Sequence, residues 1–128
     1  MMKQISVMKR RPGMTMEEFI RDYEGRHAKF GEQLFAKARR YVRRYVQPEN
    51  NPLTGQIVEL DFDVIMEIWW DSRADFEAAM KALPSSELLP AVVESGKKLF
   101  ATSNNPAFTV IEYESRMGGD ITHSNPNA

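Results

Sequence analysis

His27 is the residue in this sequence whose side chain is best suited to proton transfer. The chain holds two histidines, His27 and His123, and no cysteine. An imidazole gains and loses a proton near neutral pH, so His27 could act as a general acid or base in a pocket. The alternative is a core histidine hydrogen-bonded to a neighbour. Tyr23 precedes His27 by one helical turn and could share its pocket, whereas His123 lies in a polar terminal stretch and is expected to be inert.

Asp63 and Glu67 form a second candidate group. Residues four apart on a strand point the same way, but their Cα atoms lie about 13 Å apart, too far to share a proton. Each carboxylate therefore needs a partner from another element. That partner could be His27, whose charge they would orient or stabilise, or an arginine of a neighbouring strand. Since an unpaired charge inside an apolar strand costs several kcal/mol, Glu67 must be paired, protonated or lining a wet cavity. The candidate arginines are Arg39, Arg43 and Arg44.

Tyr41, Arg43 and Tyr45 alternate along a predicted strand and share one of its faces. Two phenols and a guanidinium could hold an anionic or aromatic ligand. A cross-strand or interface role is the alternative. Trp69 and Trp70 point to opposite faces, so one tryptophan is expected in the core and the other in a pocket or a dimer contact.

The composition makes several other kinds of chemistry unexpected. Without cysteine and with one usable histidine, the chain is poorly supplied with metal ligands, so we expect neither a metal nor another cofactor. There is no glycine-rich phosphate loop, no G-x-S-x-G and no His-x-x-x-His pair. A formal charge of -1, from 17 basic and 18 acidic residues, provides no general attraction for nucleic acid.

The first helix is the element that must position His27. Thr15 and Glu18 have the spacing of a capping box, so this helix is expected from about Met16 to about Leu34. Apolar and aromatic residues recur within it at helical spacing and fall within an arc of about 80°. That stripe consists of Met16, Phe19, Tyr23, His27, Phe30 and Leu34. The ring of His27 is therefore expected to face the sheet rather than solvent.

The remaining pattern predicts an α+β fold. Strands are expected at residues 5–9, 39–46, 63–70 and 107–113. A second helix begins at Asp71-Ser72 and ends at Pro84, and a third is capped by Ser86 with Pro90 in its first turn. Residues 47–60 form a long loop. The order β-α-β-β-α-(α)-β is that of the ferredoxin-like split βαβ arrangement, a four-stranded antiparallel sheet with helices on one face.

Length and patterning predict one domain that pairs with a second copy. The 128 residues are divided into an ordered domain, residues 1–115, and a flexible C-terminal tail, residues 116–128. Because the strand at 63–70 is apolar on both faces, its bare face is expected to meet a second subunit in a homodimer of two facing sheets. With no signal segment and no apolar run of about 20 residues, we expect a cytoplasmic protein without a membrane contact.

The chain resembles the EthD-like proteins of the dimeric α+β barrel superfamily from about Ile5 to Glu114. The resemblance rests on an ordered set of short motifs: Lys9-Arg10-Arg11-Pro12-Gly13, Thr15-x-Glu17-Glu18-Phe19, His27-Ala28, Arg40-Tyr41-Val42, Asp63, Glu67-Ile68-Trp69-Trp70-Asp71-Ser72, Phe76 and Phe100. Two positions differ from the pattern of the family. Lys29 replaces the proline that often follows the His-Ala pair, and the usual acidic residues around Phe100 are absent.

This resemblance implies a homodimer with a pocket between sheet and helices. Related proteins include cofactor-free lyases, cyclases and isomerases of small aromatic, polyketide or lactone compounds, and the histidine matching His27 is the expected proton-transfer residue. We therefore expect a cofactor-independent lyase, dehydratase, decarboxylase, cyclase or isomerase of a catabolic or secondary-metabolite pathway. The expected catalytic residues are His27, Tyr41, Asp63 and Glu67, and the expected substrate-binding residues are Tyr23, Arg43, Tyr45, Trp69 and Phe100. The alternatives are a non-catalytic dimer that binds a small hydrophobic ligand or assists a degradation pathway, and a cofactor-independent monooxygenase.

Overall fold

A computed structural model describes residues 1–118 of the chain. Its elements, in order, are β1 (Met2–Met8), α1 (Met16–Asp22), the π-helical turn η1 (Tyr23–His27), α2 (Ala28–Leu34), β2 (Arg40–Tyr45), β3 (Val64–Trp70), α3 (Arg73–Ala82), the 3-10 turn η2 (Leu83–Ser85), α4 (Leu89–Leu99) and β4 (Ala107–Thr109). Most of the predicted tail lies outside the described residues. None of the helices in residues 1–118 is long and apolar enough to cross a membrane.

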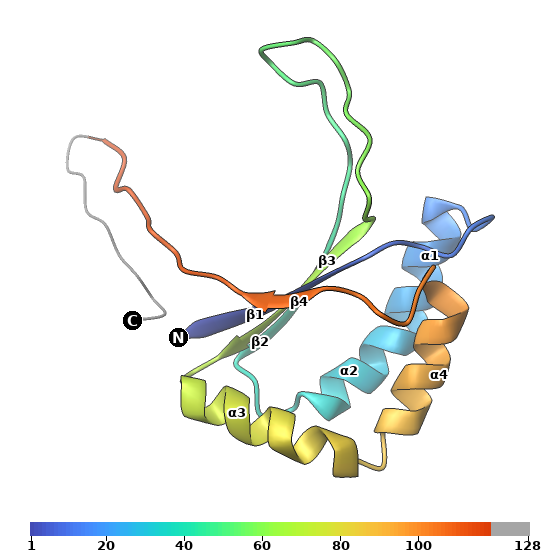
Figure 1. Cartoon of the computed structure of the whole chain (residues 1–128), viewed down its shortest axis with the longest axis vertical. Coiled ribbons are helices and arrows are strands. Elements are labelled where there is room, and N and C mark those ends of the chain that lie inside the picture. The colour runs from blue at the N-terminus through green and yellow to red at the C-terminus, as the bar shows by residue number, and fades with distance from the viewer. Residues whose placement is uncertain (119–128) are drawn as a thin grey trace.

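The four strands form one antiparallel sheet in the order β2-β3-β1-β4. All helices lie on one face of this sheet, and the other face carries no helix (Figure 1). The predicted ferredoxin-like α+β fold is therefore confirmed. β4 is shorter than the predicted strand at 107–113, because its pairing with β1 extends over only three residues, Gln4 to Ser6.

The first helix begins at the predicted capping box. Thr15 Oγ1 accepts a hydrogen bond from the Glu18 backbone N–H (3.1 Å), and Glu18 Oε1 accepts one from the Thr15 backbone N–H (3.1 Å). The helix runs to Leu34 as predicted, but a π-helical turn, η1, separates α1 from α2. A π turn is wider than an α turn and inserts an irregularity that a 3.6-residue period does not predict.

Alternation along β3 separates the buried face of the sheet from the open one. Val64, Ile68 and Trp70 point to the helices and are almost fully buried. Ile65, Glu67 and Trp69 have the opposite parity and lie on the face without helices. Thus the two tryptophans point to opposite faces, as predicted, and Trp70 is the one in the core.

The two later helices, α3 and α4, begin near the predicted positions. Ser72 caps α3 by accepting a hydrogen bond from the Asp75 backbone N–H (3.1 Å). The expected cap at Ser86 is wrong, because Leu88 occupies the N-cap position of α4. Ser86 Oγ instead accepts from the Leu88 backbone N–H (3.2 Å), a short-range turn bond that competes with the cap. Pro90 lies in the first turn of α4, as predicted.

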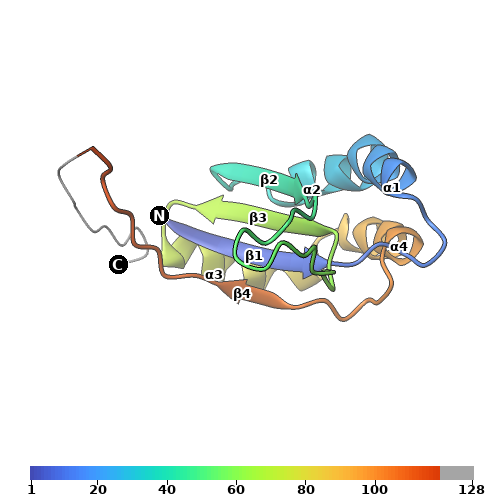
Figure 2. The same ribbon diagram turned by 90° about the horizontal axis from the view of Figure 1, so that it is seen from above.

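Two extended segments project from the compact part of the chain. Residues 46–63, which we call the loop arm, rise from the sheet on the side away from the helices (Figures 1 and 2). A turn at the tip of this arm is held by the Asn50–Ile57 bridge and by the Gly55 backbone N–H, which donates to the Asn51 carbonyl (2.7 Å). Residues 110–118, the terminal arm, follow β4 without regular secondary structure.

Gly31 of the first helix packs closely against Tyr41 of β2. A Cβ added there would lie 2.6 Å from the Tyr41 hydroxyl oxygen and 2.8 Å from its ring. Gly31→Ala is expected to lower the free energy of unfolding by about 1–3 kcal/mol. Tyr41 must move to make room for the added Cβ, and this cost exceeds the gain from the higher helix propensity of alanine. Chemical denaturation measures this loss.

Gly25→Ala is the matched control in the same helical segment. A Cβ at this position meets nothing within 4 Å. The substitution should leave stability unchanged or raise it by up to about 1 kcal/mol through helix propensity. Equal losses at both glycines would contradict the close packing of Tyr41 against Gly31.

Candidate functional site

The ring of His27 lies between the first helix and α4. Its Nδ1 is 3.0 Å from Ser95 Oγ, and Ser95 is only 4% exposed. The ring makes edge-to-face contacts with Tyr23 (centroids 5.0 Å apart) and Phe100 (5.3 Å). His27 is buried, as predicted, but its hydrogen bond is to α4 rather than to the sheet. Gly96 lies beside the ring, and a Cβ added there would be 3.8 Å from His27 Cε1, an ordinary van der Waals contact.

Burial keeps the His27 imidazole uncharged near neutral pH. It lowers the pKa of His27 from 6.5 to about 4, and no charged neighbour contributes to the shift. A neutral imidazole can accept a proton, so the arrangement suits a base rather than an acid at neutral pH. Nε2 makes no hydrogen bond within residues 1–118.

Three tyrosines gather next to His27, with an ion pair at their edge. The hydroxyls of Tyr23 and Tyr41 interact with each other, and Tyr45 donates a hydrogen bond to Glu24 Oε2. Arg43 binds Glu24 through Nη2 (2.5 Å) and Nε (3.0 Å). These contacts provide partners for most of the polar side-chain groups that β2 places beneath the first helix.

The tyrosines are suited to donate hydrogen bonds rather than to accept protons. Burial is the main cause that raises the pKa of Tyr23, Tyr41 and Tyr45 above the ordinary value of a phenol. The hydrogen bond from Arg43 lowers the pKa of Glu24, so this carboxylate stays charged beside the phenols. Protonated phenols can stabilise negative charge on an oxygen atom that develops nearby.

Tyr23 joins the histidine to the rest of the aromatic group. Its ring contacts His27, Tyr45 (centroids 5.8 Å apart) and Phe100 (5.8 Å), and its hydroxyl reaches Tyr41. The structure therefore brings six of the expected site residues together. They are His27, Tyr23, Tyr41, Arg43, Tyr45 and Phe100.

Asp63 is not part of this group. It lies just before β3, where its Oδ2 accepts a hydrogen bond from the Arg10 backbone N–H (2.8 Å) and lies 4.0 Å from Arg10 Nε. The Asp63 backbone N–H donates to the Met8 carbonyl (2.9 Å). These contacts tie the ends of β1 and β3 together, which is a structural role.

Glu67 and Trp69 lie on the open face of the sheet, away from His27. Glu67 binds Arg44 Nε (2.7 Å) and accepts a hydrogen bond from Trp69 Nε1 (3.0 Å). Burial raises the pKa of Glu67, but these two bonds outweigh it and the pKa lies below the ordinary value. The Trp69 ring has Lys3 4.0 Å and Arg40 4.3 Å from its centroid. The sequence left open whether Glu67 is paired, protonated or lining a wet cavity, and in the structure it forms an ion pair.

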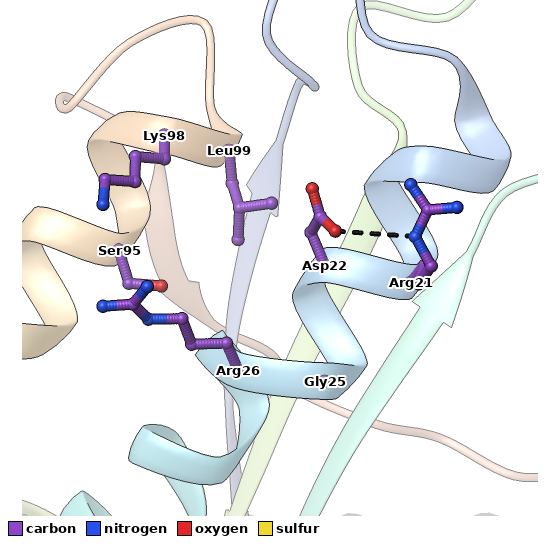
Figure 3. A pocket seen from close by; sticks show the side chains of 7 residues that line it. All are labelled: Arg21, Asp22, Gly25, Arg26, Ser95, Lys98 and Leu99. Carbon is purple, nitrogen blue, oxygen red and sulfur yellow. Dashed lines mark ion pairs between the residues drawn. The ribbon is translucent and has the colours of Figure 1, made fainter.

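A cavity of about 330 Å³ lies beside the His27–Ser95 pair, between the first helix and α4. Figure 3 shows the Arg26 side chain reaching towards α4, where Ser95 and Lys98 lie. His27 does not line the cavity, but its hydrogen-bond partner Ser95 does. The lining residues are Arg21, Asp22, Gly25, Arg26, Ser95, Lys98 and Leu99.

The sequence analysis did not identify Ser95, Arg26 or Lys98 as site residues. Ser95 falls on the apolar stripe of α4, three residues after Val92 and four before Leu99. A polar residue at such a position is buried and needs a partner, which is a signal that the sequence does contain. Nothing in the local sequence distinguishes Arg26 and Lys98 from other surface cations.

Metal ligands do not converge in the described part of the chain. Within residues 1–118, no three histidine, aspartate or glutamate side chains are placed to hold a metal ion together. The expectation that the protein works without metal or cofactor stays a prediction.

A four-stranded antiparallel sheet with helices on one face (Figure 1) defines a protein of the ferredoxin-like α+β class. The model of the EthD domain matches residues 11–88, which is more than half of the chain. The protein therefore belongs to the EthD domain family. A search of curated proteins finds no match to this sequence.

Two solved structures share the fold at low sequence identity. An EthD family protein from Bacillus halodurans is 16% identical, with a TM-score of 0.58, and the alignment covers 88% of this chain and 99% of that one. An uncharacterized NIPSNAP domain protein from Burkholderia xenovorans is 12% identical, with a TM-score of 0.51 and coverages of 88% and 94%. At these identities the similarity describes the fold.

The buried histidine predicts a pH dependence of stability. Its pKa is about 4 in the folded chain and about 6.5 in the unfolded chain, so the unfolded state binds more protons between these values. The contribution of neutral His27 to stability is therefore fully present above pH 6.5, and it is lost as the pH decreases towards 4. The loss amounts to as much as about 3 kcal/mol at 1.36 kcal/mol per pKa unit.

Urea denaturation of the wild type and of His27→Gln at several pH values from 4 to 8 measures this effect. Carboxylates titrate in the same range, so the quantity of interest is the difference between the two proteins. The wild type should lose stability relative to His27→Gln as the pH falls from 6.5 to 4. A constant difference across this range would show that the pKa of His27 is not lowered.

Proposed function

We propose that the protein is a cofactor-free enzyme that transfers a proton within a small aromatic, polyketide-like or lactone substrate, with His27 as the acid/base. One observation carries the proposal: a buried, uncharged imidazole is fixed at Nδ1 by Ser95, and Nε2 has no partner in residues 1–118. A fixed, neutral ring has a nitrogen lone pair that can accept a proton at neutral pH.

The reaction would use His27 to remove a proton from a carbon or hydroxyl of the substrate. If Nδ1 donates its hydrogen to Ser95 Oγ, Nε2 carries the lone pair that accepts this proton. The same nitrogen would return the proton to another atom of the substrate or to a leaving oxygen. Such steps underlie dehydration, decarboxylation with reprotonation, cyclisation and isomerisation.

The aromatic group around Tyr23 would bind and stabilise the substrate. Tyr23 and Phe100 present ring edges and faces beside His27, which suits an aromatic or conjugated compound. The hydroxyl of Tyr41 lies at the end of the same group and would stabilise an enolate oxygen. Arg43 is held by Glu24 and would act as a positioning residue for this tyrosine, whose ring it contacts at 4.7 Å.

A non-catalytic, ligand-binding function is the second candidate. The observation that favours it is that the lining of the cavity includes Ser95 and three cationic side chains but does not include His27. A ligand bound there would not touch the imidazole. In that case the protein would carry or sense a small molecule in a degradation pathway, and the histidine would serve packing.

We also propose that the protein forms a homodimer through the open face of its sheet. This face carries apolar side chains from several strands, including Ile5, Ile65 and Phe108, around Trp69. Both arms add exposed apolar residues, and Leu53 at the tip of the loop arm is 93% exposed. A second copy on the open face would lie beside the loop arm, which rises on that side (Figure 1).

Turnover by His27 variants tests the enzymatic proposal. The substrate is unidentified, so the assay follows proton NMR spectra of a panel of β-diketones, aryl ketones and lactones in deuterated buffer, where proton transfer exchanges hydrogen for deuterium. His27→Ala should lower turnover by a factor on the order of 10²–10⁴. His123→Ala, which removes the other histidine, is the control and should keep the wild-type rate.

A thermal melt of each variant separates catalysis from packing. If His27 is only a core residue, His27→Ala should cost about 1–3 kcal/mol of stability through a cavity and an unpaired Ser95. A variant that melts early but turns over normally per folded molecule would end the catalytic proposal. Absence of exchange in the wild type across the whole panel would favour the ligand-binding function.

Sedimentation of arm and sheet variants tests the dimer. Wild type should sediment at about twice 14.7 kDa at micromolar concentration, and Ile65→Asp should give the monomer because a charge would be buried at the interface. Leu53→Ser with Val58→Ser should weaken the dimer. Val93→Ser, which changes an exposed apolar residue on the helical side, is the matched control. A wild-type mass near 14.7 kDa would contradict the proposal.

A further inference from the structure

The cavity between the first helix and α4 has a charged wall that the proposed chemistry at His27 does not use. Its volume of about 330 Å³ is at the small end of the range for sites that bind small molecules. Three of its seven lining residues are cations, Arg21, Arg26 and Lys98, and one is an anion, Asp22. The lining therefore carries a net charge of +2, in a chain whose overall charge is -1.

Two of the three cations are left without an acidic partner. Arg21 Nε lies 3.7 Å from Asp22 Oδ1, so these two charges largely offset each other. In residues 1–118, neither Arg26 nor Lys98 forms an ion pair. Figure 3 shows their side chains extending from opposite walls, Arg26 from the π-helical turn and Lys98 from α4. An anion between the two walls would meet both charges.

The lining of the cavity also includes a serine and an apolar side chain. Ser95 is almost fully buried, and its oxygen, already bonded to His27 Nδ1, has further capacity for a hydrogen bond. Leu99 follows one turn later on α4 and is 3% exposed. A ligand that fits this wall has an anionic group for the cations and a compact apolar body for Leu99.

We propose that this cavity binds a small organic acid, whose carboxylate is held by Arg26 and Lys98 and whose apolar body contacts Leu99. The planar guanidinium of Arg26 can donate two hydrogen bonds to a carboxylate, and the ammonium of Lys98 adds a point charge. Gly25, which also lines the cavity, has no side chain, and a Cβ there would meet nothing within 4 Å. The inference goes beyond the proposed function, because binding needs no proton transfer at His27.

An NMR titration with sodium benzoate tests the proposal on the full chain. Benzoate is the probe because it joins one carboxylate to a compact apolar ring. Amide signals of Gly25, Arg26, Ser95 and Lys98 should shift and saturate. Benzamide, which has the same shape without charge, should bind at least tenfold more weakly. The affinity for benzoate should fall as salt is added, since part of it is electrostatic.

Charge-removing variants locate the site. Arg26→Gln and Lys98→Gln should each weaken benzoate binding about fivefold or more, which corresponds to about 1 kcal/mol. Lys97→Gln is the matched control, because Lys97 neighbours Lys98 on α4 but lies outside the cavity and near Glu94 (4.0 Å). It should keep the wild-type affinity.

Three outcomes would overturn the proposal. One is a lack of saturable benzoate binding, and another is an equal loss in Lys97→Gln and Lys98→Gln. The third is saturable binding of inorganic phosphate without binding of benzoate, which would assign the cavity to a different anion. Because the titration has no catalytic readout, its outcome is separate from that of the turnover experiment.

Discussion

Edge-to-face packing around Tyr23 is the interaction on which the helical side of this protein depends. The ring contacts Phe19 and His27 on its own helix, Tyr45 on β2 and Phe100 at the end of α4. Aromatic pairs in this geometry bury a large area and add about 0.5–1.5 kcal/mol each beyond it. One side chain thus joins the first helix, an edge strand and the last helix, and it sets the place of the histidine between them.

Buried polar groups in this protein find their partners in other elements of the fold. His27 reaches Ser95 on α4, and Glu24 reaches Arg43 and Tyr45 on β2. On the opposite face, Glu67 reaches Arg44. Each bond offsets a cost of desolvation that an unpaired group would impose. The same bonds hold these side chains still, which is what a site for proton transfer requires.

The two faces of the sheet carry different properties because alternate residues of each strand point in opposite directions. The face under the helices holds the tyrosines, the partly buried Arg43–Glu24 ion pair and the core. The open face holds Trp69 between Lys3 and Arg40, with apolar neighbours and the loop arm beside it. The structure of an EthD family protein shares this fold at 16% identity. The fold requires apolar side chains at the alternate strand positions that face the helices, and different residue types can meet this requirement.

The sequence alone determined the features that depend on near neighbours and on periodicity. The capping box at Thr15, the helix from Met16 to Leu34 and the alternation of β3 each depend on residues a few positions apart, so the fold class followed from them. The common face of Tyr41, Arg43 and Tyr45 followed in the same way.

Tertiary structure decided which distant residues meet. Ser95 is 68 positions from His27, and no local rule pairs them. The choice of Arg44 for Glu67 was fixed by strand register, and the charged cavity was formed by the packing of α4 against a π-helical turn. Long-range partners depend on how whole elements pack against one another, and residues a few positions apart in the sequence do not specify that packing.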